Sequence, residues 1–220
     1  MLTMKSIVLS SLLVFLLSGI LVGQQDPEAK KILDRVAAKT KKYKTIQADF
    51  KLSVINRPEK NTSSSEGKIK IRGDKYQMDM LGSKVYYDGK TMWNYTPDVK
   101  EVTITEPDKN DSDFMDNPAK IFTWYNRDFK YQFIKKFEKD GNSYYEIYLF
   151  PKNLNQPYVR FNVVINADTD QISSITSVGK EGVDYKIELS NIVTDQPLDD
   201  SIFEFNTTKH KKVEVIDMRL

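Results

Sequence analysis

The sequence has 220 residues, no cysteine and a formal net charge of +2. A balance this close to neutral gives no electrostatic reason to expect a nucleic-acid partner. The absence of cysteine excludes disulfides, thiol catalysis and cysteine-based zinc sites. The length is that of one domain with a substantial core.

The first 23 residues have the features of a secretory signal peptide. Lys5 supplies the positive charge, and an apolar stretch of 16 residues follows at 7–22. This stretch is slightly shorter than the roughly 20 residues of a transmembrane helix. We therefore predict cleavage near Gly23, with an uncleaved anchor as the alternative. Residues 24–220 are expected to form one exported domain.

An amphipathic helix is predicted at the start of this domain. Asp26 suits the N-cap and Pro27 suits the first helical position. The apolar positions that follow are spaced as on one helix face, and lysines cover the other face. These positions are Ala29, Ile32, Leu33, Val36, Ala37 and Thr40.

Nearly all of the remaining sequence has the two-residue alternation of β-strands. The first strand alternates Ile46, Ala48, Phe50, Leu52 and Val54 with polar residues, and a polar turn is expected at 57–65. Later strands are expected at 69–71, 76–80, 86–95, 102–105, 129–137, 144–150, 159–165, 172–178, 185–192 and 213–218. About eleven strands in up-and-down order predict a mainly β protein, an incomplete, half-open antiparallel barrel.

A hairpin at 86–105 carries many aromatic residues. Asp88-Gly89 favours a two-residue turn, and a second turn is expected at 96–98. The alternation places Tyr86, Thr91, Trp93 and Tyr95 on one face, and Val85, Tyr87, Met92 and Asn94 on the other. Both faces are partly apolar, and we take the Trp93 face as the one that lines a cavity.

The segment 113–128 interrupts the strand pattern. Asn117 can cap a short helix that has Pro118 at its first position. The segment is rich in apolar residues, among them Met115, Ile121, Phe122, Trp124 and Tyr125. A short apolar helix between strands is suited to cover the open mouth of a barrel, and we call it the lid helix.

The sequence offers no catalytic constellation. His210 is the single histidine and lies among lysines, so it is interpreted as a solvated surface residue. No phosphate-binding glycine loop and no G-x-S-x-G motif occur. We predict that the protein is not an enzyme and has no cofactor and no metal site.

The apolar composition is compatible with a cavity. The chain has 11 Phe, 12 Tyr, 2 Trp and 7 Met residues. Aromatic side chains and methionine are broad and deformable, which suits an adaptable apolar site. The same residues at strand spacing are also typical of an ordinary packed core, so composition alone leaves both interpretations open.

Several short motifs occur along the chain. The hairpin carries D-G-K-x-x-W-x-Y at 88–95, and A-D-F stands at 48–50. The other stretches are 67–76, N-P-A at 117–119, F-P-K at 150–152, F-E-F at 203–205 and V-E-V-I-D at 213–217. In their order these motifs resemble those of the LolA family of periplasmic lipoprotein carriers. The chain departs from the family pattern at Gly73, where the family has proline, and at Tyr76, where it has phenylalanine.

The resemblance implies a monomeric periplasmic carrier whose half-open barrel is closed by the N-terminal helix and the lid helix. Its expected partners are acylated lipoproteins, an inner-membrane lipoprotein-releasing ABC transporter and an outer-membrane acceptor. The arginine of the family's R-P strand bonds to backbone groups of the lid, and Arg72 stands at that position. The expected ligand-binding residues are Phe50, Leu52, Arg72, Tyr76, Met78, Met80, Tyr86, Trp93, Tyr95, Met115, Ile121, Phe122 and Tyr125.

Two alternatives keep the same fold. One is a sensor module, although sensors of this kind usually have a second domain for which this chain has no room. The other is a carrier for a different amphiphile, such as a glycolipid.

Overall fold

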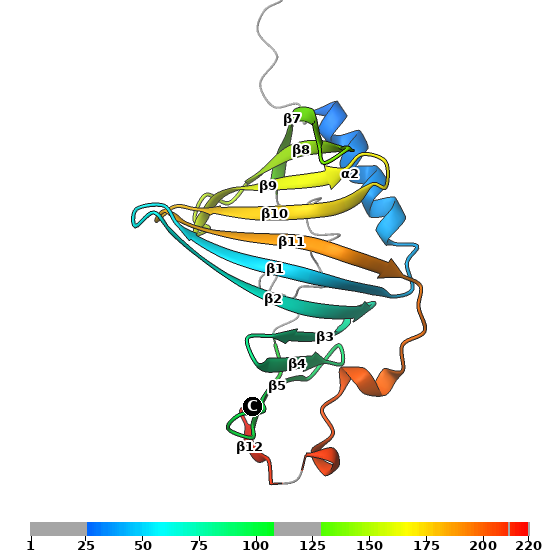
Figure 1. Cartoon of the computed structure of the whole chain (residues 1–220), viewed down its shortest axis with the longest axis vertical. Helices are drawn as coiled ribbons and strands as arrows, with labels where there is room; N and C mark the ends of the chain where they lie inside the picture. The colour runs from blue at the N-terminus through cyan, green and yellow to red at the C-terminus, as the bar shows by residue number, and fades with distance from the viewer. Residues whose placement is uncertain (1–25, 108–128, 211, 220) are drawn as a thin grey trace, which may run out of the picture.

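A computed structural model of the protein describes residues 26–107, 129–210 and 212–219. Within these residues, one α-helix and one twelve-stranded sheet make up the fold (Figure 1). The helices are α2 (Pro27–Thr40) and the 3₁₀ helices η2 (Asp200–Phe203) and η3 (Thr207–Lys209). The strands are β1 (Ile46–Asn56), β2 (Asn61–Arg72), β3 (Lys75–Met80), β4 (Ser83–Tyr87), β5 (Met92–Thr96), β6 (Glu101–Thr105), β7 (Phe129–Lys139), β8 (Asn142–Pro151), β9 (Tyr158–Asn166), β10 (Gln171–Gly179), β11 (Val183–Thr194) and β12 (Glu214–Asp217).

The sheet is open, and its strand order differs from the predicted up-and-down order. The order is β12-β6-β5-β4-β3-β2-β1-β11-β10-β9-β8-β7. The first strand, β1, pairs antiparallel with both β2 and β11, so it joins the two halves of the sheet. At one edge, β12 pairs in parallel with β6. Strand periodicity predicts individual strands but not which distant strands pair, because pairing depends on contacts between residues far apart in sequence.

Two turns differ from their predicted form. Asn61–Ser65 were expected in a polar turn but belong to β2, where Asn61 pairs with Asn56 and Ser63 with Val54. The ladder with β1 therefore extends the strand through residues that have no apolar pattern. In the aromatic hairpin Tyr87 pairs with Met92, so the loop has four residues instead of two.

The longer loop of the hairpin is held together by Asp88. Its Oδ1 accepts hydrogen bonds from the backbone N–H groups of Lys90 and Thr91 at 2.8 and 2.7 Å. Gly89 has a φ of 97°, which only glycine adopts readily. The loop is longer by two residues, and an even shift leaves every side chain on its predicted face.

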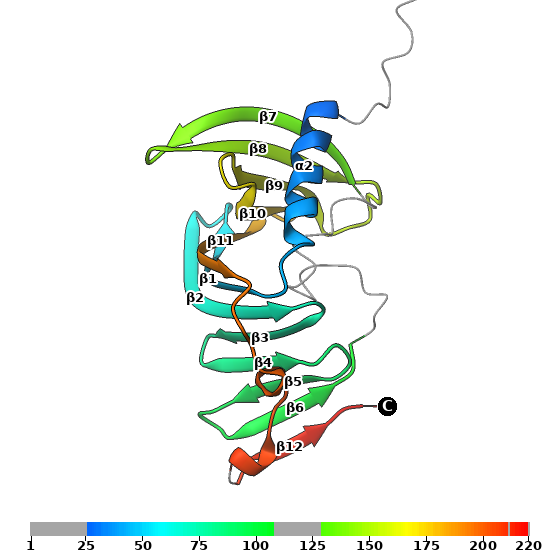
Figure 2. The ribbon, with the colours of Figure 1, turned by 90° about the vertical axis from the view of Figure 1, so that its right-hand side faces the viewer.

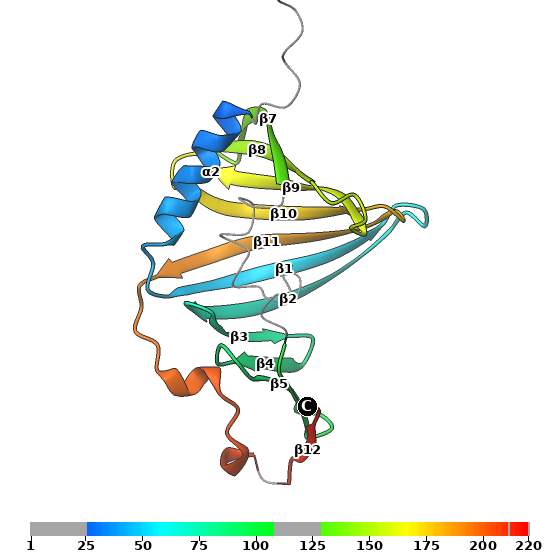
Figure 3. The ribbon, with the colours of Figure 1, turned by 180° about the vertical axis from the view of Figure 1, so that it is seen from behind.

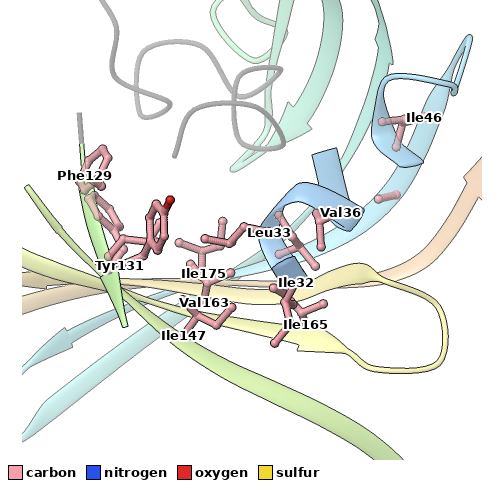
Figure 4. Packing of buried hydrophobic residues seen from close by; sticks show 14 of the residues in the cluster. Ile32, Leu33, Val36, Ile46, Phe129, Tyr131, Ile147, Val163, Ile165 and Ile175 are labelled. Atoms are coloured by element: carbon pink, nitrogen blue, oxygen red, sulfur yellow. The ribbon is translucent and has the colours of Figure 1, made fainter. Parts of the chain in front are cut away.

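Helix α2 lies across the inner face of the curled sheet, over β7 to β10 (Figure 2). It buries Ala29, Ile32, Leu33 and Val36, as its spacing predicted. In Figure 4 Ile32 and Leu33 lie beside inward-facing residues of the sheet, Ile165 on β9 and Ile175 on β10. The C-terminal half of the helix is fixed by Arg35, which donates to Asp170 at 3.0 Å in the turn between β9 and β10.

Asp26 connects the start of the helix to the sheet. Its Oδ1 accepts from the N–H groups of Glu28 and Ala29 at 2.9 and 3.1 Å, and its Oδ2 accepts from Phe133 N on β7 at 2.8 Å. Partial burial alone would raise the pKa of Asp26, but the three N–H donors outweigh it and lower the pKa below its ordinary 3.8.

A pH-dependent contribution to stability follows from this lowered pKa. Because the folded-state pKa lies below the unfolded value, the contribution is present above about pH 4 and is lost as the pH falls through the folded pKa. Asp26→Ala should cost about 1–2 kcal/mol of unfolding free energy at pH 7. Urea unfolding at pH 7 and pH 3 measures this, and the difference between wild type and variant should shrink at pH 3. An equal difference at both pH values would contradict the role of the charge.

Candidate functional site

The inner face of the sheet is apolar well beyond the area under α2. Register aligns inward-facing residues of successive strands in rows: Phe50, Gly67 and Met80 form one row, and Ile71, Tyr76 and Tyr87 form another. A third row runs from Ala48 through Ile69 and Met78 to Val85. Side chains in such rows are cross-strand neighbours and make one continuous surface.

Part of this surface is only half-buried. Residues under α2, such as Ile147 and Ile165, are fully buried. On β3, β4 and β5, and at Leu52 of β1 and Ile187 and Leu189 of β11, the inward-facing aliphatic and methionine side chains are partly exposed. We call this region the open inner face, and it consists of Leu52, Met78, Met80, Val85, Met92, Ile187 and Leu189.

The aromatic part of the inner face is more tightly packed than the methionines. Tyr76 and Tyr87 are 3% and 6% exposed, and their rings lie 5.3 Å apart. The Tyr76 hydroxyl lies 3.5 Å from the Met92 sulfur. These tyrosines are therefore part of the packed core, and the flexible methionine side chains form the accessible surface of the inner face.

Gly67 is required by the packing of Phe50. A Cβ at this position would lie 2.4 Å from Phe50 Cζ and 2.6 Å from the backbone oxygen of Asp79. The Phe50 ring thus lies directly over the glycine. A hollow of about 600 Å³ lies beside this pair, and its lining includes the charged residues Asp49, Lys51, Glu66, Lys68 and Asp79, which alternate onto the face opposite Phe50.

Gly67→Ala should therefore destabilise the protein. The Asp79 carbonyl is backbone and cannot turn aside, so the clash forces a shift of β3 or of the Phe50 ring. Overpacking of this kind typically costs about 1–3 kcal/mol. Thermal unfolding should show a lowered Tm. Gly67 is not among the glycines with positive φ, so the loss reports the steric clash and not backbone strain. A Gly67→Ala variant as stable as wild type would contradict this packing.

The hairpin residues Tyr86, Trp93 and Tyr95 do not lie on the inner face, which corrects the prediction that the Trp93 face lines the cavity. Register pairs Tyr86 with Trp93 on the outer face, whereas Tyr87 pairs with Met92 on the inner face. The physical reason is that the chain after β11 covers the outer face here. Phe205 packs against Tyr95 and Tyr86 at centroid distances of 4.9 and 5.8 Å.

Residues 198–210, which we call the C-terminal strap, run past the ends of the strands and lie against β3 to β5 before β12 (Figures 1 and 3). Phe203 of this strap is fully buried where η2 meets β3 and β4. His210 stacks on Phe205 at 4.6 Å and is half-buried, so its interpretation as a solvated residue was wrong. The sequence signal for this strap is F-E-F at 203–205. This motif alternates like a strand, but Phe203 and Phe205 are instead two buried side chains that attach the strap to the sheet.

Arg72 also lies on the outer face and holds the strap. Its Nη1 donates to the Leu198 carbonyl at 2.8 Å, its Nη2 forms an ion pair with Asp200, and its guanidinium carbon lies 5.3 Å from the Phe203 ring centre. Lys75 shares Asp200 at 2.9 Å. Within the residues that the structure describes, the partner of Arg72 is this strap, whereas the lid was the expected partner.

The structure thus brings together five of the expected ligand-binding residues and separates four others from them. Phe50, Leu52, Tyr76, Met78 and Met80 share the inner face, while Arg72 and the three hairpin aromatics lie on the outer face. The lid helix and its residues Met115, Ile121, Phe122 and Tyr125 lie outside the described residues. Sequence reasoning missed Ile187 and Leu189, because only the pairing of β11 with β1 places them beside Leu52 and Phe50.

Neither metal chemistry nor a membrane-spanning helix is found in the described part of the chain. Among residues 26–107, 129–210 and 212–219, no group of three His, Asp or Glu residues could hold a metal ion. Over the same ranges no helix combines the length and apolar character needed to cross a membrane.

Comparisons with known proteins agree with this geometry. Residues 41–206 match the model of the family described as Outer membrane lipoprotein carrier protein LolA. An outer-membrane lipoprotein carrier protein of Histophilus somni (strain 2336) is 26% identical over 204 residues, which cover 91% of this chain and 94% of the relative. The corresponding protein of Pasteurella multocida (strain Pm70) is 27% identical over 187 residues, covering 81% and 83%.

Solved structures show the same fold at low identity. An uncharacterized conserved protein from Thermus thermophilus has a TM-score of 0.57 and 11% identity, with 86% of this chain and 99% of that one covered. MucB has a TM-score of 0.52 and 12% identity, with 88% and 67% covered. At this identity the likeness concerns the fold alone.

Proposed function

Because this chain belongs to the LolA family of outer membrane lipoprotein carrier proteins, we propose that its open inner face binds the acyl chains of lipoproteins during transfer across the periplasm. The family consists of carrier proteins and not of enzymes, in agreement with the absence of catalytic motifs from the sequence. In this proposal the signal peptide 1–23 directs export, and residues 24–220 act as one carrier domain. An inner-membrane ABC transporter supplies the cargo and an outer-membrane acceptor receives it.

The observation that carries the proposal is the half-exposed apolar surface made by Leu52, Met78, Met80 and their neighbours. Acyl chains gain about 0.8 kcal/mol for each buried CH₂ group. A triacyl anchor therefore cannot cross water unless a protein covers it. The surface that this chain offers is continuous, apolar and free of charged side chains among its members.

The same surface is also suited to release its cargo. Three of its residues are methionines, whose flexible side chains adapt to many chain shapes without a unique fit. A carrier has to pass its cargo on, so a loosely complementary site serves better than a rigid one. In this proposal the lid helix covers the acyl chains, and Met115, Ile121, Phe122 and Tyr125 contact them.

Depletion of the protein in its native bacterium tests the proposal. Inner and outer membranes are then separated and their lipoproteins quantified. Outer-membrane lipoproteins should accumulate in the inner membrane. Unchanged sorting would contradict the proposal and favour a carrier for another amphiphile, such as a glycolipid.

A further inference from the structure

One stretch of β2 is a strand edge that no other described strand covers. Residues 61–66 pair with β1, but pairing with β3 begins only at Gly67, opposite Met80. The β1–β2 hairpin therefore extends beyond β3, as Figures 1 and 3 show from opposite sides. The free edge, as we call residues 61–66, offers backbone N–H and C=O groups that β1 does not use.

The register identifies which groups these are. The two-residue turn between β2 and β3 makes Arg72 and Lys75 a closing pair that exchanges hydrogen bonds. N–H and C=O directions alternate along a strand, and β2 shows no register shift against β1 or β3. The backbone N–H and C=O groups of Thr62, Ser64 and Glu66 therefore point the same way as those of Arg72, away from β1.

The two strands at the ends of the sheet, β7 and β12, are protected in ways that the free edge is not. The outer edge of β7 carries Lys130, Lys135 and Lys136 and a bulge at Phe133, whose N–H is capped by Asp26. The opposite edge strand, β12, has only four residues and carries two acidic residues. Charges, bulges and short length are the usual means of preventing strand addition. Residues 61–65 have no charge, no proline and no bulge.

The free edge adjoins the open inner face. Leu52 of the open inner face pairs with Ser65 of the free edge. Met80, also of the open inner face, pairs with Gly67, the residue that follows the free edge. An occupant of the inner face can therefore continue onto the backbone edge without crossing the sheet.

We propose that the free edge binds the cargo's own polypeptide, adding as a β-strand the stretch that follows the acylated residue. This proposal rests on the proposed function, because it requires acyl chains on the open inner face. The free edge spans about 20 Å, enough for about six residues of an extended peptide. Hydrogen bonds from Thr62, Ser64 and Glu66 are made to the peptide backbone, so recognition does not depend on cargo sequence.

Hydrogen exchange of the full-length mature protein tests this with two probes. One is a triacylated lipopeptide with ten residues after the acylated one, and the other is the same triacyl group on a single amino acid. The lipopeptide should slow exchange of Thr62, Ser64 and Glu66 by about tenfold, the factor for about 1.4 kcal/mol. The single-residue probe should protect only the inner face.

The outcomes separate the two proposals. Equal exchange at the free edge with and without the peptide, while the inner face is protected by both probes, overturns strand addition and leaves the carrier function intact. No protection by either probe overturns the carrier function itself. Protection of the free edge that rises with protein concentration without any probe indicates a second copy as the occupant and also overturns the proposal.

A pair of variants adds an independent readout. Ser64→Pro removes the outward N–H that the peptide needs, and prolines are tolerated at edge positions of this kind. Ser64→Ala is its matched control, since both variants lose the 2.9 Å contact between the Ser64 and Ser53 hydroxyls. Ser64→Pro should bind the lipopeptide about fivefold more weakly than Ser64→Ala and bind the single-residue probe equally. Equal lipopeptide affinities would overturn the proposal.

Discussion

Replacing Met78 by glutamate is expected to lower the affinity for a triacylated lipopeptide by roughly 100-fold or more, with little change in stability. Met78 lies in the middle of the open inner face, between Ile69 and Val85. An acyl chain that covers this position would bury the introduced carboxylate without a partner, at a cost of several kcal/mol. Without ligand the side chain keeps partial contact with water, because Met78 is only half-buried.

The neighbouring residue provides the control. Gln77 is also half-buried but pairs with Tyr86, on the outer face. Gln77→Glu adds the same charge one residue away and should leave lipopeptide binding unchanged. Isothermal titration calorimetry with the lipopeptide measures the affinity of both variants. An equal loss of lipopeptide affinity in the two variants, or no loss of affinity in Met78→Glu, would contradict acyl binding at the inner face.

Phe203→Ala is expected to have the largest effect on stability, about 3–5 kcal/mol. Phe203 is fully buried where η2 meets β3 and β4, with the Arg72 guanidinium over its ring. Its loss leaves a cavity that the short 3₁₀ helix cannot close without releasing the strap. Urea unfolding with an unchanged m-value measures the change in unfolding free energy.

Asp200→Asn measures how much the ion pairs beside the Phe203 ring contribute to stability. Asp200 is 65% exposed and pairs with Arg72 and Lys75, and exposed ion pairs contribute about 0–1 kcal/mol. The asparagine variant should therefore lose about 1 kcal/mol at most. A Phe203→Ala variant no less stable than Asp200→Asn would show that charge and not burial holds the strap.

Much of the fold follows from local patterns, which explains both the agreement and the corrections. Helix α2 was predicted from Asp26, Pro27 and its apolar spacing, and an open, mostly antiparallel sheet was predicted from strand alternation; the structure confirms both. Long-range pairing was beyond reach, because nothing local shows that β1 pairs with β11. The extension of β2 through 61–65 was missed for the same reason.

The error over the hairpin face has a specific cause. Period-two alternation sorts Trp93 and Met92 onto opposite faces but does not say which face is inside. Normally the polar face is outside, but here both faces are apolar because the strap covers the outer one with Phe205. F-E-F at 203–205 was the available clue, and it became interpretable only when the strap was seen on the outer face.

The central claim is that acylated cargo lies against the inner face and not the outer one. The most direct measurement is site-specific photo-crosslinking in intact cells of the native bacterium. A photoreactive residue is placed at Met78 in one variant and at Trp93 in another, on opposite faces of the same sheet. We predict that the Met78 variant crosslinks to acylated lipoproteins and the Trp93 variant does not. Crosslinks from Trp93 alone, or from neither position in a cell that is sorting lipoproteins, would contradict the claim.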